Sequence, residues 1–88
     1  MLTIRRDTQL KKDVKRLLKR GKDLDKFKKI ILLLVNAQKL PVKFKDHQLK
    51  GTFKDCRECH IEPDWLLIYR IEGSVLCLVR SGSHSDLF

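Results

Sequence analysis

Three histidines, His47, His60 and His84, are the side chains of this 88-residue sequence best suited to acid–base chemistry near neutral pH. An unperturbed imidazole has a pKa of about 6.5, so it can donate or accept a proton in that range. Glu58 stands two residues before His60, and in an extended segment the two side chains share one face. Arg80 stands four residues before His84 and could add a cation. A lone imidazole is more often structural, but together these residues predict an acid–base cluster beside an arginine.

Such a cluster suits the cleavage of RNA through attack by a ribose 2′-hydroxyl on the adjacent phosphate. This reaction needs a base for the hydroxyl proton, an acid for the departing 5′-oxygen and a cation for the charge on the phosphate. Trp65 and Phe88 could stack on bases, an interaction that tolerates any sequence. Trp65 could equally well belong to the core, because its segment is apolar, whereas Phe88 lies outside any apolar segment.

The cysteines form a second motif, since residues 56–60 match C-x-x-C-H, the attachment signature of c-type haem. Haem attachment requires export and usually a second axial ligand, but we expect no export signal, and Met1 is the only methionine. Zinc is disfavoured too, because Cys56 and Cys59 would point to opposite faces of an extended strand. Three cysteines without an export signal indicate reduced, buried thiols. We therefore expect no metal and no cofactor.

The first half of the chain supplies helices. Leu2 and Ile4 alternate with polar residues and predict a short strand, after which Asp7 or Thr8 could cap a helix. An apolar stripe at helical spacing then continues to a stop near Gly21. A second helix, capped by Asp23, should end before residue 41, because Pro41 disfavours helical geometry in the residue before it. The outcome is a two-helix hairpin.

The second half should form strands. Helical periodicity is lost over residues 40–52, so we expect His47 in a loop. Three apolar runs, at residues 54–61, 65–71 and 74–80, are joined by short connections that suit hairpins, and they predict an antiparallel three-strand meander. The middle strand should be covered on both faces, and the meander could bring Arg80 and the His84 tail near the start of the first strand. Residues 81–88 are too few for another element. The fold class is α+β, in one domain over residues 1–88.

Net charge is concentrated in one half of the molecule. The chain carries +9, of which residues 1–50 contribute +11 and residues 51–88 contribute −2. This excess favours a polyanionic partner, with nucleic acid first. The longest apolar run has six residues, whereas a membrane-spanning helix needs about 20, so no membrane association is expected. Without a secretory signal, we expect a cytoplasmic protein.

Three segments together resemble a known family: KDHQLKG at residues 45–51, HIEPDWLLIY at residues 60–69 and RSGSHSDLF at residues 80–88. The sequence is similar to the YafQ branch of the RelE/ParE superfamily of toxins from bacterial type II toxin–antitoxin systems. The resemblance covers essentially the whole chain, and the middle segment is its most specific part. It implies an endoribonuclease, an mRNA interferase, that cleaves mRNA at the ribosome without a metal and is inhibited by a cognate antitoxin.

The resemblance also implies a set of site residues. The positions that match the family's functional residues are His47, His60, Asp64, Trp65, Arg80, His84 and Phe88, and Glu58 stands where related proteins carry an acidic residue. In this interpretation His84 is the acid, His60 or His47 the base, Arg80 binds the scissile phosphate, and Asp64 or Glu58 orients an imidazole. Trp65 and Phe88 would bind the substrate. Two alternatives stay open: a gyrase-inhibiting toxin of the ParE branch, and a non-catalytic RNA-binding module for which the basic half would suffice.

Overall fold

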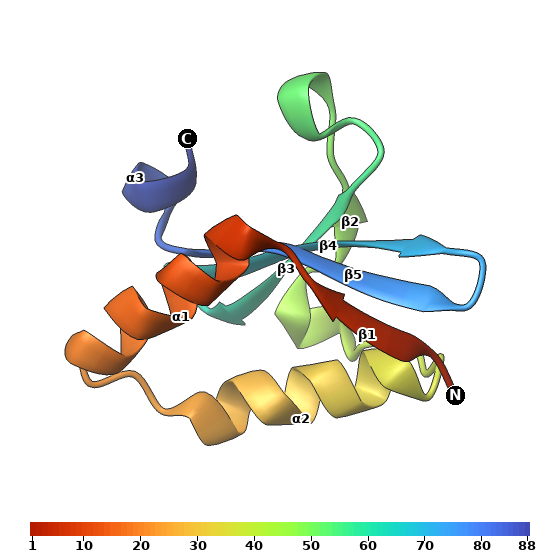
Figure 1. Ribbon diagram of the computed structural model, residues 1–88, viewed down its shortest axis with the longest axis horizontal. Coiled ribbons are helices and arrows are strands. Elements are labelled where there is room, and N and C mark those ends of the chain that lie inside the picture. Colours follow the sequence, from red (N-terminus) through yellow and green to blue (C-terminus); the bar gives the residue numbers. More distant parts are fainter.

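A five-stranded sheet organises the computed structural model, which describes all residues 1–88 (Figure 1). The spatial strand order is β1-β5-β4-β3-β2. Along the chain the elements are β1 (Thr3–Arg6), α1 (Thr8–Lys19), α2 (Leu24–Val35), the 3-10 helix η1 (Val42–Phe44), β2 (His47–Gln48), the 3-10 helix η2 (Gly51–Phe53), β3 (Arg57–Glu62), β4 (Trp65–Glu72), β5 (Val75–Gly82) and α3 (His84–Leu87). The predicted α+β class, with a short strand, a helical hairpin and a meander, is confirmed.

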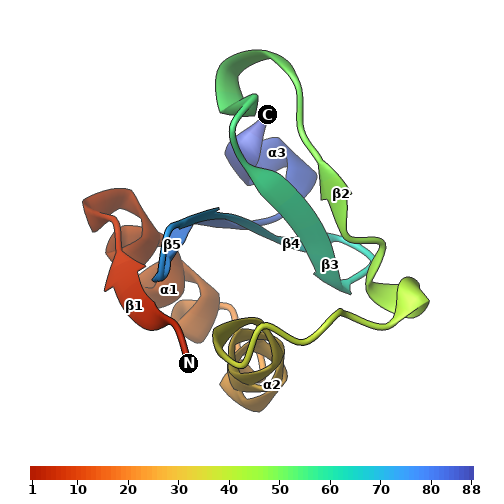
Figure 2. The same ribbon diagram turned by 90° about the vertical axis from the view of Figure 1, so that its right-hand side faces the viewer.

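Both long helices lie on the same side of the sheet (Figure 2). The stripe of α1 buries Leu10 and Leu17 against the sheet, and Gly21, with a φ of 77°, turns the chain toward α2. Glycine enters this left-handed region without the steric cost that a Cβ brings. The Asp23 side chain accepts a hydrogen bond from the backbone N–H of Asp25 (3.0 Å) and so caps α2, as predicted. No helix combines the length and the apolar character needed to cross a bilayer.

The central strand β4 is covered on both faces, as the sequence predicted. Its Leu67 and Tyr69 belong to the large core beneath the helices. Leu66 and Ile68 point the other way, into a smaller cluster that includes Leu87 of α3. The sheet therefore has a helix-covered face and an opposite face, on which the C-terminal turn packs.

Three expectations need correction. His47 lies in strand β2, opposite Glu58, and not in a loop. The sequence does not reveal this strand, because only two residues of β2 pair with β3 and they leave no hydrophobic pattern. The tail extends β5 to Gly82 and then forms α3, which a capping box between Ser83 and Asp86 stabilises. We expected the end of the third meander strand near the start of the first, but the end of β5 lies level with the end of β3, with β4 between them. The reason is that alternate strands of a meander run in the same direction.

Candidate active site

Three imidazoles form a row that runs from β2 through β3 to α3. The ring centroids of His47 and His60 are 6.3 Å apart, and those of His60 and His84 are 5.9 Å apart. Strand pairing creates this row, because β2 places His47 opposite Glu58, two residues from His60. On the other side, His60 pairs with Leu66 and Leu66 with Gly82, so α3 begins close to His60. The structure thus brings together the three predicted histidines from three separate elements.

Glu58 stands between two of these rings. Its side chain is only 6% exposed, and its Oε1 lies 3.2 Å from Nε2 of His60 and 3.9 Å from Nε2 of His47. Nδ1 of His47 lies 2.7 Å from the backbone carbonyl oxygen of Lys45. A carbonyl only accepts, so Nδ1 of His47 donates its hydrogen and a neutral His47 has its lone pair on Nε2. Glu58 therefore orients the ring of His60, with which it shares a strand face, while the Lys45 carbonyl orients the ring of His47.

Asp64 is the partner of the third histidine. Its Oδ1 accepts a hydrogen bond from Nδ1 of His84 (2.9 Å) and another from the backbone N–H of His84 (3.0 Å). These two bonds, the backbone one first, lower the pKa of the Asp64 carboxyl, so Asp64 is anionic at neutral pH. The anion fixes the ring orientation of His84 and stabilises positive charge on it. Each end of the His60–His84 pair thus has its own carboxylate.

Helix α1 anchors the short helix that carries His84. Asp86 receives hydrogen bonds from both terminal nitrogens of Arg20 (2.6 and 3.0 Å) and lies 3.2 Å from Nη1 of Arg16. It also accepts from the backbone N–H of Ser83 (2.9 Å). The bond with Arg20 is the largest cause of a pKa well below the usual range of an aspartate. The position of α3 therefore depends on charge pairing with a helix that lies far away in the sequence.

Arg80, the predicted cation, is held by a residue that sequence reasoning missed. Its Nε and Nη2 donate to the two carboxylate oxygens of Asp13 on α1, at 2.8 and 3.1 Å. This pairing raises the already high pKa of Arg80, so its charge is permanent. A signal was present in the sequence: Asp13 lies between Leu10 and Leu17 on the apolar stripe of α1. A charged residue in a buried stripe requires a buried partner.

The two aromatic residues of the predicted site differ in exposure: Trp65 is buried and Phe88 is exposed. Trp65 corrects our expectation of base stacking, because its side chain is 0% exposed. Its ring stacks on Phe27, with the ring planes 1° from parallel, and its Nε1 donates to Oγ of Ser81 (3.0 Å). Because the residue is completely buried, its ring has no face free for a base. Phe88 is 64% exposed and lies 6.5 Å from the His84 ring, centroid to centroid. Phe53, which was not among the predicted site residues, packs edge-on against Phe88, with their ring centroids 5.9 Å apart.

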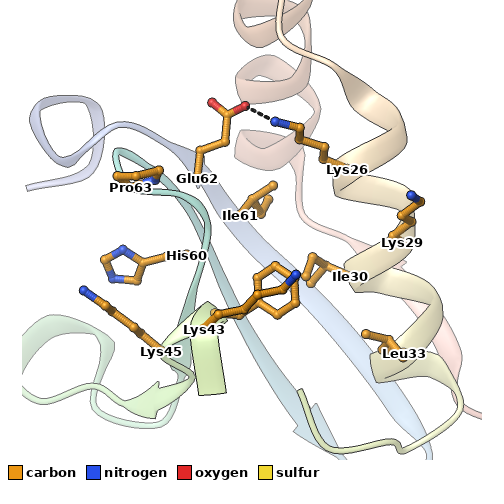
Figure 3. Close-up of a pocket in the computed structure, with 11 residues that line it drawn as sticks. Lys26, Lys29, Ile30, Leu33, Lys43, Lys45, His60, Ile61, Glu62 and Pro63 are labelled. Atoms are coloured by element: carbon orange, nitrogen blue, oxygen red, sulfur yellow. Dashed lines mark hydrogen bonds and ion pairs between the residues drawn. The ribbon is translucent and has the colours of Figure 1, made fainter. Parts of the chain in front are cut away.

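A basic groove opens beside the histidine row. It has a volume of about 570 Å³ and lies between α2, the η1 segment and the end of β3 (Figure 3). Its lining combines lysines with apolar side chains and includes His60: Lys26, Lys29, Ile30, Leu33, Lys43, Phe44, Lys45, His60, Ile61, Glu62 and Pro63. Lys26 is neutralised by Glu62 (2.9 Å). The groove offers positive charge next to the site that the histidines form.

Potential metal ligands do not converge in the structure. No three histidine, cysteine, aspartate or glutamate side chains form a group arranged to hold an ion. Cys56 and Cys59 are buried in different clusters on opposite faces of the sheet, as their spacing predicted. The C-x-x-C-H motif therefore consists of two core thiols and one site histidine.

The sequence and the structure are similar to those of known proteins over nearly the whole chain. A family model described as the bacterial toxin of type II toxin–antitoxin systems, YafQ, matches residues 2–88. The mRNA interferase toxin YafQ of Escherichia coli K12 is 46% identical over 81 residues, which cover 91% of this chain and 88% of the relative. Among solved structures, a metal-bound toxin from Helicobacter pylori is 50% identical, with a TM-score of 0.93 and full coverage of both chains. The E. coli DinJ–YafQ complex has a YafQ-like chain at 42% identity and a TM-score of 0.92, covering 100% of this chain and 99% of that one.

Proposed function

Because this chain belongs to the YafQ family of toxins from bacterial type II toxin–antitoxin systems, we propose that it is an mRNA interferase whose histidine row performs the chemistry. One observation supports this proposal above the others: the ring centroids of His60 and His84 lie 5.9 Å apart. Each ring contacts its own carboxylate, Glu58 for His60 and Asp64 for His84. Two imidazoles at that separation can flank one phosphate, one removing a proton while the other donates one.

In the proposed reaction His60 is the base and His84 the acid. His60, oriented by Glu58, removes the proton from a ribose 2′-hydroxyl, and the oxygen attacks the adjacent phosphorus. The new P–O2′ bond forms as the P–O5′ bond breaks, which leaves a 2′,3′-cyclic phosphate. His84, held by Asp64, donates its proton to the departing 5′-oxygen. His47 lies beyond His60, and its Nε2 stands 3.9 Å from the same Glu58 oxygen, outside hydrogen-bond distance, so we assign His47 to substrate contact.

Two further residues complete the proposed site. Arg80 stabilises the negative charge that accumulates on the phosphate in the transition state. Phe88 stacks on a base next to the cleaved bond, because its exposed ring lies beside His84. These groups supply every proton transfer, so the proposed mechanism needs no metal. The metal in the H. pylori relative makes this point worth a direct test with a chelator.

Partners follow from the charge distribution and the relatives. The E. coli relative was crystallised in complex with DinJ, and we propose that this chain also binds a cognate antitoxin and that the antitoxin covers its site. An acidic segment of the antitoxin would match the +11 half of the chain. We further propose that this basic half docks on ribosomal RNA phosphates and that cleavage takes place on translated mRNA in the cytoplasm. The match to YafQ makes the ParE-like alternative less favourable, and the histidine–carboxylate pairs do the same for a non-catalytic module.

The test is cleavage of mRNA in a translating extract by folded variants. His60→Gln and His84→Gln should each reduce the cleavage rate on the order of 10²–10⁴-fold, the usual contribution of a general acid or base. His47→Gln should have a smaller effect, and Glu72→Gln, in an exposed position far from the row, is the matched control. Cleavage should persist in EDTA and stop at a nucleotide with a 2′-deoxy sugar. Full activity of a folded His84→Gln protein, or cleavage 3′ of the deoxynucleotide, would contradict the mechanism.

A further inference from the structure

Asp13 is the most deeply buried charged side chain of the molecule. It lies on the face of α1 that packs against the sheet, between Leu10 and Leu17, with 0% of its surface exposed. Burial of a carboxylate costs free energy unless charges and hydrogen bonds compensate it, and an apolar side chain of similar size often stabilises a core better. The packing of α1 alone therefore does not explain an aspartate here.

Four donors surround this carboxylate. Oδ2 accepts from Nε of Arg80 (2.8 Å) and from the backbone N–H of Ser81 (3.1 Å). Oδ1 accepts from Nη2 of Arg80 (3.1 Å) and from Nη2 of Arg16 (2.9 Å). Two adjacent donors of one guanidinium thus meet two oxygens of one carboxylate, a contact that fixes the plane of the arginine. Neither bond uses Nη1 of Arg80, which keeps both of its N–H groups for another ligand.

The Arg80 side chain is 20% exposed and leaves the strand one residue before Ser81 and four before His84. A free arginine side chain samples many rotamers, and ordering it costs conformational entropy. Asp13 removes that freedom before any RNA binds. The arginine is therefore already oriented when a phosphate arrives, and this preorganisation is what makes transition-state stabilisation effective.

From this geometry we propose that Asp13 is a positioning residue of the active site, which acts on cleavage through Arg80 by holding its guanidinium toward the scissile phosphate. The proposal rests on the proposed function. It assigns a role in the reaction to helix α1, on which Asp13 lies 67 positions before Arg80 in the sequence. Asp13 touches neither substrate nor reacting atoms.

Asp13→Asn tests the proposal, because asparagine keeps the shape but replaces one acceptor oxygen with an NH2 group that cannot accept from Arg80. We expect kcat to fall at least 30-fold with KM within threefold of wild type. Arg80→Lys keeps the charge and loses the two-point contact, so it should show the same pattern. The double variant should be no more than twofold slower than Arg80→Lys, because Asp13 has nothing left to position. Asp25→Asn, an exposed aspartate on α2, is the matched control.

A second measurement needs no substitution at a buried site. In 15N NMR spectra of the wild-type protein, the Nε–H of Arg80 should exchange slowly with water and should stay protected when a non-cleavable 2′-O-methyl RNA binds. The Nη1 resonance alone should shift. Loss of Nε–H protection on RNA binding would mean that Arg80 leaves Asp13 to reach the phosphate, which would overturn the proposal even if Asp13→Asn failed to fold.

Two kinetic outcomes would also overturn it: a folded Asp13→Asn protein with wild-type kcat, or a further tenfold loss when Asp13→Asn is added to Arg80→Lys. The second result would mean that Asp13 acts independently of Arg80. Failure of the proposed function looks different, because the wild-type protein itself would then leave RNA uncut. Wild-type cleavage together with an unaffected Asp13→Asn variant would disprove the positioning role alone.

Discussion

Burial decides the chemistry of individual residues in this protein, and the cysteines show it most clearly. All three thiols are free and buried. Burial, followed by the negative charges of Asp46 and Glu58, raises the pKa of Cys59 to about 12, so its thiolate is scarce at neutral pH. We predict that iodoacetamide at pH 7.5 labels no cysteine in the native protein and all three in denaturant, as counted by mass spectrometry. Rapid labelling of Cys59 in folded protein would show that the strand opens at that point. The experiment thus separates a core thiol from a reactive one.

At the scale of elements, α3 is the part of the site most dependent on distant contacts. A helix of four residues is not stable alone, because nucleation is costly. Its anchor is Asp86, whose depressed pKa means that the stabilisation is complete above the unfolded pKa of about 3.9 and is lost as pH falls through the lower folded value. We predict that the methyl signals of Leu87, which packs under α3, keep their native shifts down to pH 4 and lose them below it. Asp86→Asn should show the displaced signals already at pH 7 and cleave more slowly, with the rest of the sheet unchanged. Native shifts in that variant would mean that the capping box and the packing of Leu87 suffice.

At the scale of the whole molecule, the two halves divide charge and chemistry. Residues 1–50 carry +11, while the proposed base, acid and arginine all lie in residues 51–88, which carry −2 in total. We predict that induced expression arrests bacterial growth and that co-expression of a cognate antitoxin restores it, because an acidic cover would match both the basic surface and the open site. His84→Gln, which leaves the surface charge intact, is the control and should not arrest growth. Growth arrest by that variant would point to toxicity from polyanion binding rather than from RNA cleavage. Normal growth at high levels of wild-type protein would contradict the toxin function itself.

Local patterns were sufficient for most of the fold. Hydrophobic periodicity placed both helices and all three meander strands to within a few residues, because each element buries one face and leaves a repeat of 3.6 or 2 in the sequence. Strand β2 and helix α3 escaped prediction. Each has two to four residues, too few to show a period, and each exists because a neighbour holds it: β3 pairs with β2, and Arg20 binds Asp86. The antiparallel directions were predicted correctly, but the end of the third meander strand was wrongly expected near the start of the first, although those directions place it level with that strand's end.

For the site, the sequence by itself determined the chemical inventory: three histidines, the partner carboxylates and one arginine, with Glu58 and His60 on one strand face. Only the tertiary structure decided which groups pair, because the partners come from different elements. It paired His84 with Asp64 and Arg80 with Asp13, and it placed His47 opposite Glu58 on the neighbouring strand. It also removed Trp65 from the binding surface. Exposure depends on what packs against a side chain, and a strand that is apolar on both faces does not reveal which of its residues the helices will cover.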